Sequence, residues 1–228
     1  MDEPVKTPTG RDRASATRIA ATEAKVVAAA ARLFVERGYA GTTLADVAAA
    51  AGVGARTVYV RFGGKAELLG RVVDQAVVGD AEPVDVLGRD RMRTALTAPT
   101  AAERLAAHAA AAREIVERAG ALFAVAQQAA AVEPLIAGFW EQARAHTRHA
   151  SHAFWTRLAQ DGLLPGPCDV EALADTATVL VAAETYLLTT RLHGWTPAQY
   201  EAWLLRTTTA LAGLSPSPTA PTPTPHPG

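Results

Sequence analysis

Arg56 and Thr57 are two side chains whose types and spacing suit the recognition of nucleic-acid bases. An arginine can donate two hydrogen bonds to guanine O6 and N7, and a threonine can contact a thymine methyl group or a phosphate. Together with Ala55 they would form the first turn of a short helix over 55–62. In a helix-turn-helix this turn enters the major groove of DNA, so the pattern predicts a base-reading helix.

Two short helices joined by a glycine turn must hold these side chains in place. Thr43 offers an N-cap hydroxyl and Asp46 follows three residues later, which predicts a helix over 44–51. Gly52 ends that helix because glycine adopts positive φ readily. Apolar side chains would then pin the second helix on the first. The predicted inward-facing residues are Leu44, Val47, Ala48, Val53 and Val58.

Polar residues at the ends of these helices are predicted to contact DNA phosphates without reading the sequence. They are Thr43, Tyr59, Arg61 and Lys65. Two alternatives stay open at this point. Any pair of short helices separated by glycines shows this pattern, and Tyr59 could belong to the core.

The rest of the sequence predicts further helices and no strand. Alanine is abundant, and apolar residues recur at helical spacing. A helix over 15–37 precedes the pair and another over 65–78 follows it. The helices predicted after residue 83 span 100–118, 121–131, 134–162, 169–192 and 196–213. We therefore expect an all-α fold of about nine helices.

These elements suggest a division of the chain into two folded units with loose ends. The last 14 residues are so rich in Pro, Thr and Ser that they are not expected to pack. The predicted segments are a flexible arm (1–14), a three-helix helix-turn-helix DNA-binding domain (15–64), a connecting helix (65–82), a helical ligand-binding and dimerisation domain (83–214) and a disordered tail (215–228).

Charge is distributed unevenly along the chain, although the net charge is only −1. Up to Arg71 there are 11 Lys and Arg residues against 7 acidic residues, and beyond it there are 11 against 16. A basic head on an acidic body suits a protein that meets phosphates at one end only. Cys168 is the single cysteine, which excludes an internal disulfide. With no signal peptide and no apolar stretch long enough for a membrane span, we expect a cytoplasmic protein.

Aromatic residues on the later helices are candidates for a ligand pocket. The predicted lining residues are Phe123, Trp140, His146, Trp155 and Tyr186. Ordinary core packing is the alternative for each aromatic residue, because large aromatic side chains dominate cores. Since few lysines lie nearby, a small and largely apolar effector with a few polar groups fits better than a phosphorylated one.

Three histidines on one predicted helix raise the question of a metal site. His146, His149 and His152 are three residues apart, so the outer pair is separated by about 120° around the helix. One helix cannot present all three to one ion, and we predict no metal and no cofactor.

The last two predicted helices carry more apolar surface than one chain can cover. We expect them to form a four-helix bundle with a second copy, and the predicted interface residues are Val181, Leu188, Trp203 and Leu204. The alternative is a helix buried within one protomer.

The stretch 25–69, KVVAAAARLFVERGYAGTTLADVAAAAGVGARTVYVRFGGKAELL, resembles the N-terminal domain of the tetracycline-repressor (TetR) family of regulators. The resemblance implies about nine helices, dimerisation through the last two, and a ligand cavity in each protomer. It implies phosphate contacts at Thr43 and Tyr59, a matching lysine at Lys65, and base contacts at 55–57. Gly54 departs from the serine that the family often has, and Arg56 departs from its usual small residue.

These observations together predict a DNA-binding repressor. We expect a homodimer that binds a palindromic operator in double-stranded DNA and that a small, largely apolar effector releases. Ligand binding would tilt the helix over 65–78 and change the distance between the two reading helices. A ligand-independent architectural DNA-binding protein, an activator and an all-helical enzyme are the alternatives. No nucleophile, metal or phosphate signature supports an enzyme.

Overall fold

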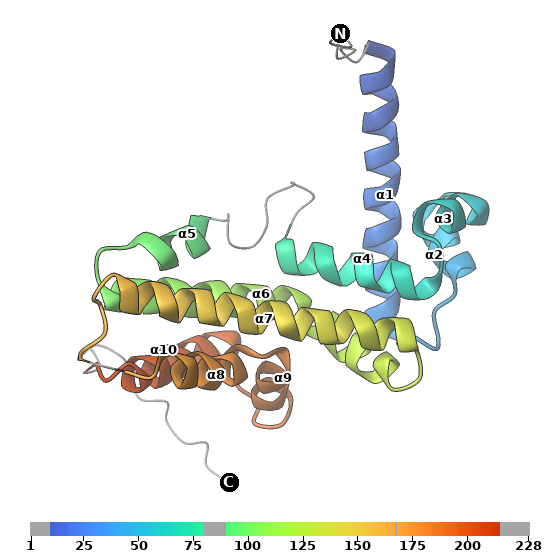
Figure 1. Ribbon diagram of the computed structural model, residues 1–228. Helices are drawn as coiled ribbons and strands as arrows, with labels where there is room; N and C mark the ends of the chain where they lie inside the picture. The colour runs from blue at the N-terminus through green and yellow to red at the C-terminus, as the bar shows by residue number, and fades with distance from the viewer. Residues whose placement is uncertain (1–9, 80–89, 167, 215–228) are drawn as a thin grey trace.

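The computed structural model describes residues 10–79, 90–166 and 168–214, and every regular element in these ranges is an α-helix (Figure 1). The helices are α1 (Gly10–Arg37), α2 (Leu44–Ala51), α3 (Ala55–Phe62), α4 (Lys65–Val78), α5 (Asp90–Thr97), α6 (Ala101–Ala130), α7 (Pro134–Gln160), α8 (Val170–Val181), α9 (Ala183–Arg191) and α10 (Pro197–Leu211). The predicted all-α fold, with an N-terminal helix-turn-helix and a helical C-terminal part, is confirmed.

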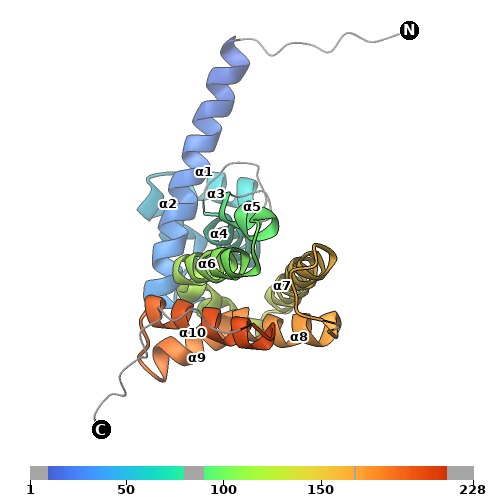
Figure 2. The ribbon, with the colours of Figure 1, turned by 90° about the vertical axis from the view of Figure 1, so that its left-hand side faces the viewer.

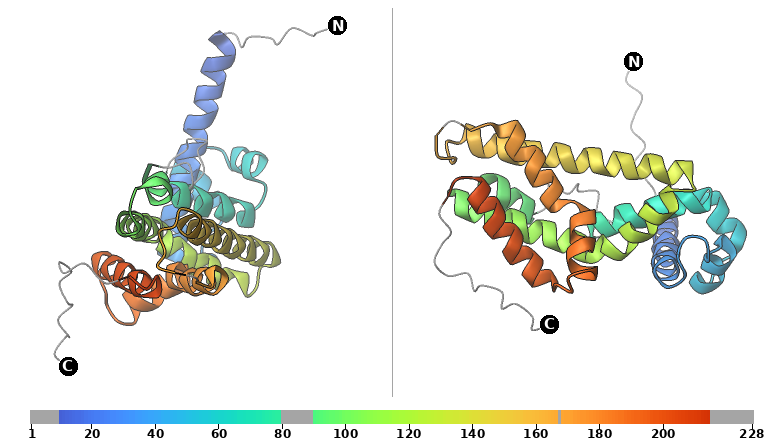
Figure 3. Two further views of the ribbon diagram at one scale, coloured as in Figure 1. Left: turned by 60° about the vertical axis from the view of Figure 1, so that its left-hand side comes forward. Right: turned by 90° about the horizontal axis from the view of Figure 1, so that it is seen from below.

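The helices form a head and a body that share one connecting helix. α1, α2 and α3 make the head, and the N-terminal part of α1 projects beyond α2 and α3 (Figures 1 and 2). α4 contacts α1, α6 and α7, so it lies between head and body. Seen from below, α8 and α9 run from the end of α7 towards α10 (Figure 3). In the view of Figure 1, α8, α9 and α10 lie below the long helices α6 and α7.

One apolar cluster joins the head to the body. Phe34 of α1, Val47 of α2 and Val58 of α3 are completely buried in it. Burial of each such side chain contributes about 1.5–3 kcal/mol, so this core fixes α3 firmly. The residues that the body contributes to the same cluster are Leu122, Val125, Ala126 and Ala129 of α6 and Ile136 of α7. The reading helix therefore rests, through one continuous core, on the C-terminal half of α6.

The structure has ten helices in its described residues where the sequence predicted about nine. α5 was not predicted, and its Ala95 is completely buried against the body. The predicted helices over 100–118 and 121–131 are one helix, α6. Gly120 does not interrupt α6. A Cβ at this position would lie 3.1 Å from Tyr186 Cε1, so the glycine serves a close approach of α9.

The predicted helix over 169–192 is broken at Ala182, whose extended backbone (φ −61°, ψ 144°) separates α8 from α9. The Thr185 hydroxyl donates to the Val179 carbonyl across the break, at 2.5 Å. No glycine or proline marks this position, so the sequence carried no signal for it.

The predicted ends of the chain differ in part from the structure. α1 begins at Gly10, so residues 10–14, predicted as part of the flexible arm, are helical. Residues 1–9, residues 80–82 of the predicted connecting helix, and the predicted tail over 215–228 lie outside the described residues. None of the helices described is both long and apolar enough to cross a membrane.

Candidate nucleic-acid interface

The turn between α2 and α3 has the local geometry that the sequence predicts. Thr43 caps α2: its hydroxyl accepts from the Asp46 N–H at 3.1 Å, and the Asp46 carboxylate accepts from the Thr43 N–H at 3.0 Å. Hydrogen bonds from the side chain and then the backbone of Thr43 lower the pKa of Asp46. Gly52 ends α2 with φ 67°, in the left-handed region. The Thr43 hydroxyl also donates to Asp46, at 2.6 Å, so a phosphate would compete with Asp46 for this proton.

The leading turn of α3 is open to solvent. Ala55 and Arg56 are exposed, and Thr57 is half-buried. Arg56 has no ion-pair or hydrogen-bond partner among the residues that the structure describes. Tyr59 is 65% exposed, which rules out the alternative that it belongs to the core. Val58 alone of this helix is buried, and it anchors α3 while the outward side chains remain available.

Gly54, the N-cap of α3, makes no side-chain capping bond. Its φ of −69° is ordinary for any residue, and a Cβ there would meet only Thr57 Oγ1, at 3.8 Å. The position is therefore free to carry a side chain, and the first N–H groups of α3 lack the acceptor that a serine would provide.

The two cations of the predicted phosphate-contacting set, Arg61 and Lys65, have partners inside the protein. Arg61 Nη1 lies 2.9 Å from Glu23 Oε1 on α1. Lys65 Nζ donates to the Tyr39 carbonyl at 2.8 Å and lies 4.1 Å from the centroid of the Tyr39 ring. Each would have to exchange this partner for a phosphate, or contact DNA in addition to it.

Tyr39 also ties the head to the turn between α6 and α7. Its hydroxyl donates to Glu133 Oε2 at 3.2 Å. Partial burial and the nearby Glu133 carboxylate raise the pKa of Tyr39 to about 12. The tyrosine therefore stays protonated and keeps donating over the whole physiological pH range.

Two further contacts fix α4 on the body. A Cβ at Gly70 would lie 3.0 Å from the ring of Phe139 on α7, so the ring packs directly on the helix backbone. The Arg118 guanidinium on α6 donates to the carbonyls of Ala76 and Val77, at 3.3 and 3.1 Å, near the C-terminal end of α4. Sequence reasoning missed these residues because each acts through a partner more than 40 positions away.

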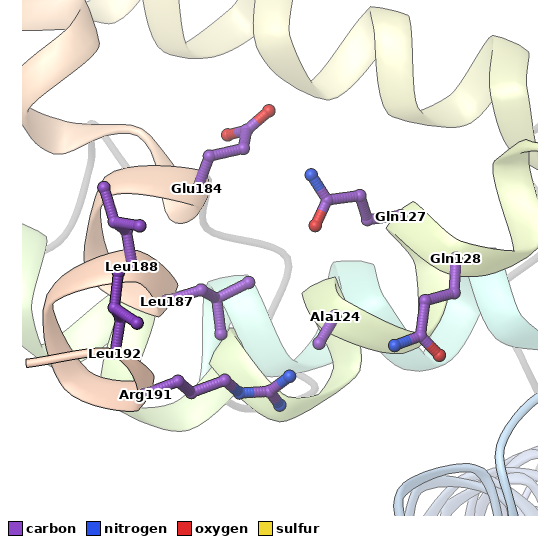
Figure 4. Close-up of a pocket in the computed structure, with 8 residues that line it drawn as sticks. All are labelled: Ala124, Gln127, Gln128, Glu184, Leu187, Leu188, Arg191 and Leu192. Atoms are coloured by element: carbon purple, nitrogen blue, oxygen red, sulfur yellow. The ribbon is translucent and has the colours of Figure 1, made fainter. Parts of the chain in front are cut away.

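A pocket of about 370 Å³ opens between α6 and α9 (Figure 4). Its lining residues are Ala124, Gln127 and Gln128 of α6, and Glu184, Leu187, Leu188, Arg191 and Leu192 at the α9 side. Half of the lining is apolar and half is polar. The lining is more polar than that of most small-molecule sites, which are mainly apolar with a few polar groups.

None of the five residues predicted to line a ligand pocket lines this one. Phe123 is buried and meets the half-buried Trp140 edge to face, with ring centroids 5.8 Å apart. Trp155 is completely buried in the body core, and Tyr186 packs edge-on against Tyr200. Their places agree with the alternative of core packing. His146 is exposed on α7.

The residues predicted for a dimer interface are divided by the structure. Val181 and Trp203 are half-buried, and Leu188 is 54% exposed and lines the pocket. Leu204 is completely buried within its own protomer, against Tyr200 and Val116. Leu204 therefore has no surface to offer a second copy, and its assignment to the interface was wrong.

The predicted histidine cluster is not assembled into a metal site. His152 Nε2 lies 3.2 Å from Asp175 Oδ1 on α8, and the same carboxylate binds Arg148. In the part of the chain that the structure describes, no group of three His, Cys, Asp or Glu side chains could hold a metal ion.

A helix-turn-helix whose leading turn is exposed, mounted through one helix on a helical body, defines the class of DNA-binding transcriptional regulators. Residues 26–72 match the family model of the bacterial regulatory proteins of the tetR family. Residues 26–72 are therefore a DNA-binding domain of this family, as the sequence resemblance predicts.

Two curated relatives share this N-terminal domain. The HTH-type transcriptional regulator TtgR of Pseudomonas putida is 47% identical over 53 residues, which are 23% of this chain and 25% of that protein. The probable HTH-type transcriptional regulator ArpR, also of Pseudomonas putida, matches with the same values. The match thus spans only about a quarter of the length of these relatives.

Solved structures extend the likeness to the whole fold. A TetR-family regulator structure from Syntrophomonas wolfei has a TM-score of 0.68 at 17% identity, covering 84% of this chain and 95% of that one. A transcriptional regulator from Pseudomonas aeruginosa PAO1 has a TM-score of 0.65 at 21% identity, covering 84% and 90%. A complex of SmeT with triclosan has a TM-score of 0.64 at 19% identity, covering 90% and 100%.

Proposed function

We propose that this chain is a ligand-responsive repressor that binds a palindromic operator as a homodimer and is released by a small effector. The observation that carries the proposal is the double role of α6. Leu122, Val125, Ala126 and Ala129 pack in the core beneath the helix-turn-helix, and Ala124, Gln127 and Gln128 in the same two turns line the pocket. A molecule that enters the pocket therefore touches the helix on which the DNA-reading unit rests.

The DNA contacts that we propose follow the exposure of the head. Ala55, Arg56 and Thr57 read bases, and Thr43 and Tyr59 contact phosphates. Arg61 and Lys65 contribute charge near the backbone while keeping or exchanging their internal partners.

The proposed dimer forms through the outer face of α8 and α10. Val179 is 64% exposed, and Val181 and Trp203 are only half-buried. Apolar side chains left exposed on neighbouring helices mark a surface that another chain covers. The exposed Leu188 and Leu192 of α9 line the pocket and are assigned to it rather than to the dimer face. A two-fold axis there would place two copies of α3 for successive major grooves, which requires a separation of about 34–36 Å.

The proposed release works through α4. Three contacts hold the head and α4 on the body: Tyr39 with Glu133, Phe139 on Gly70 of α4, and Arg118 at the carbonyls of Ala76 and Val77. A shift of α6 or α7 moves these contacts and so tilts the head. A hundredfold loss of DNA affinity requires that the ligand favour the tilted state by about 2.7 kcal/mol.

Selection of bound sequences from random duplex DNA, with the purified full chain, tests the proposal. We expect a palindrome whose half-sites are about one helical turn apart, and a dimer by light scattering at micromolar concentration. A screen for small molecules that release this operator then tests the ligand response. Enrichment of no sequence, or a monomer that binds DNA, would contradict the proposal.

A further inference from the structure

The pocket between α6 and α9 is formed by two helix faces that approach each other without packing together. Glu184, Leu187, Leu188, Arg191 and Leu192 recur at the spacing of one helix face, as do the three lining residues of α6. Such faces normally interdigitate when two helices lie side by side. Here they leave about 370 Å³ between them, although α6 and α9 touch where Gly120 meets Tyr186.

The break at Ala182 sets the position of the acidic group in this pocket. Because α9 starts anew at Ala183, Glu184 stands in its first turn and points its carboxyl group into the pocket (Figure 4). Glu184 Oε1 is buried and accepts no hydrogen bond. A carboxylate can accept several hydrogen bonds through its two oxygens, so the Glu184 carboxyl group can also accept one from a ligand in the pocket.

Charges around the pocket decide what kind of donor fits. Arg144 Nε of α7 lies 3.2 Å from Glu184 Oε1, close enough for an ion pair although no hydrogen bond forms between them. Arg191 brings a second cation to the opposite side of the pocket (Figure 4). The negative charge of Glu184 is thus already balanced, and a cationic ligand would gain little. An anionic ligand would face the Glu184 carboxylate.

The remaining lining residues describe the body of the ligand. The Gln127 amide points towards the same part of the pocket as the Glu184 carboxyl group (Figure 4). Leu187 and Ala124 form an apolar middle, and Leu188 and Leu192 stand on one side of it. A largely apolar molecule could cover the leucines and direct one polar group at Glu184 and Gln127.

We propose that the effector is a neutral, largely apolar molecule with a hydroxyl group that donates a hydrogen bond to Glu184. The inference rests on the proposed function, because it assigns a ligand class to the effector site of that function. It makes Glu184 the residue that distinguishes a hydroxyl-bearing ligand from an ether of the same shape.

Four probes with one biphenyl body test the ligand class: para-phenylphenol, its methyl ether, para-phenylbenzylamine as a cation and para-phenylbenzoate as an anion. Their binding to the full chain is measured by isothermal titration calorimetry. A hydrogen bond to a carboxylate predicts that the phenol binds about ten- to a hundredfold more tightly than the ether. We expect the cation and the anion to bind more weakly than the phenol. Tightest binding by either ion would overturn the proposal.

Glu184→Leu tests the residue, with Glu141→Leu on the exposed face of α7 as the matched control. The first variant should lose the preference for the phenol over the ether, and the control should keep it. Glu184→Gln, which keeps an acceptor but removes the charge, should retain part of the preference. Thermal unfolding and operator binding by each variant show that it is folded. An undiminished preference in Glu184→Leu would refute the assignment.

The same experiment separates this inference from the proposed function. If the phenol binds with the expected preference but leaves operator affinity unchanged, the ligand assignment stands and the proposed release by ligand fails. If no probe binds to a protein that still binds its operator, the ligand assignment fails.

Discussion

Replacing Arg56 with alanine should abolish discrimination at one base pair of each half-site without affecting stability. The Arg56 side chain is exposed and has no partner among the described residues, so its loss should change the free energy of unfolding by less than about 0.5 kcal/mol. A bidentate contact between arginine and guanine is worth about 1–3 kcal/mol. Affinity for the selected operator should therefore fall by about 5- to 150-fold for each half-site contact.

Fluorescence anisotropy with labelled duplexes measures this effect on three DNAs: the operator, an operator with one changed base pair in each half-site, and a random duplex. Wild type should lose affinity for the changed operator, and Arg56→Ala should bind operator and changed operator equally. Arg32→Ala is the control for charge, because it removes one exposed arginine of α1 whose side chain pairs with Glu36 at 3.6 Å. Equal losses by Arg56→Ala on operator and random DNA would show that Arg56 supplies only charge.

Three further predictions concern stability. Gly120→Ala should destabilise the protein by about 1–3 kcal/mol in urea unfolding, because its Cβ would meet Tyr186 at 3.1 Å; an unchanged midpoint would mean that α9 shifts freely. Gly54→Ser should raise the free energy of unfolding by a few tenths of a kcal/mol by capping α3, whereas a loss would show that the hydroxyl finds no N–H group. Burial lowers the pKa of His108 from 6.5 to about 4. Between these two pH values the unfolded chain therefore binds a proton at this histidine and the folded chain does not. Stability should fall by up to about 3 kcal/mol as the pH drops from 6.5 to 4, and His108→Leu should remove that part of the slope.

Local signals made the head predictable from the sequence. Thr43 caps α2 through Asp46, three residues on, and Gly52 ends the helix by bonding to Ala48, four residues back. Both signals are local, and the structure places each as predicted. The bounds of α2, α3 and α4 agree with the prediction because a cap or a glycine marks each end. The exposure of Arg56 and Tyr59 follows from Val58, which turns its own side of α3 to the core and leaves both on faces that point away from it.

The body was predicted less well because its features depend on contacts between distant segments. Gly120 looks like a helix end in the sequence, but in the structure it admits the Tyr186 ring. The break at Ala182 is marked by no proline or glycine in the sequence. Aromatic residues such as Trp155 are as suited to a core as to a pocket, so residue type alone could not locate the cavity. The pocket instead uses leucines and amides, whose convergence requires the three-dimensional fold.

The two faces of α6 limit which substitutions can change the ligand preference of the protein. Along α6 the positions that meet a ligand alternate with positions that support the head, so enlarging a side chain at Ala124 risks displacing its neighbour Val125 from the core beneath α3. The side chains of α9 that line the pocket do not also pack in the core beneath α3. New chemical preferences can therefore arise through substitutions in α9, while the grip on DNA is inherited unchanged.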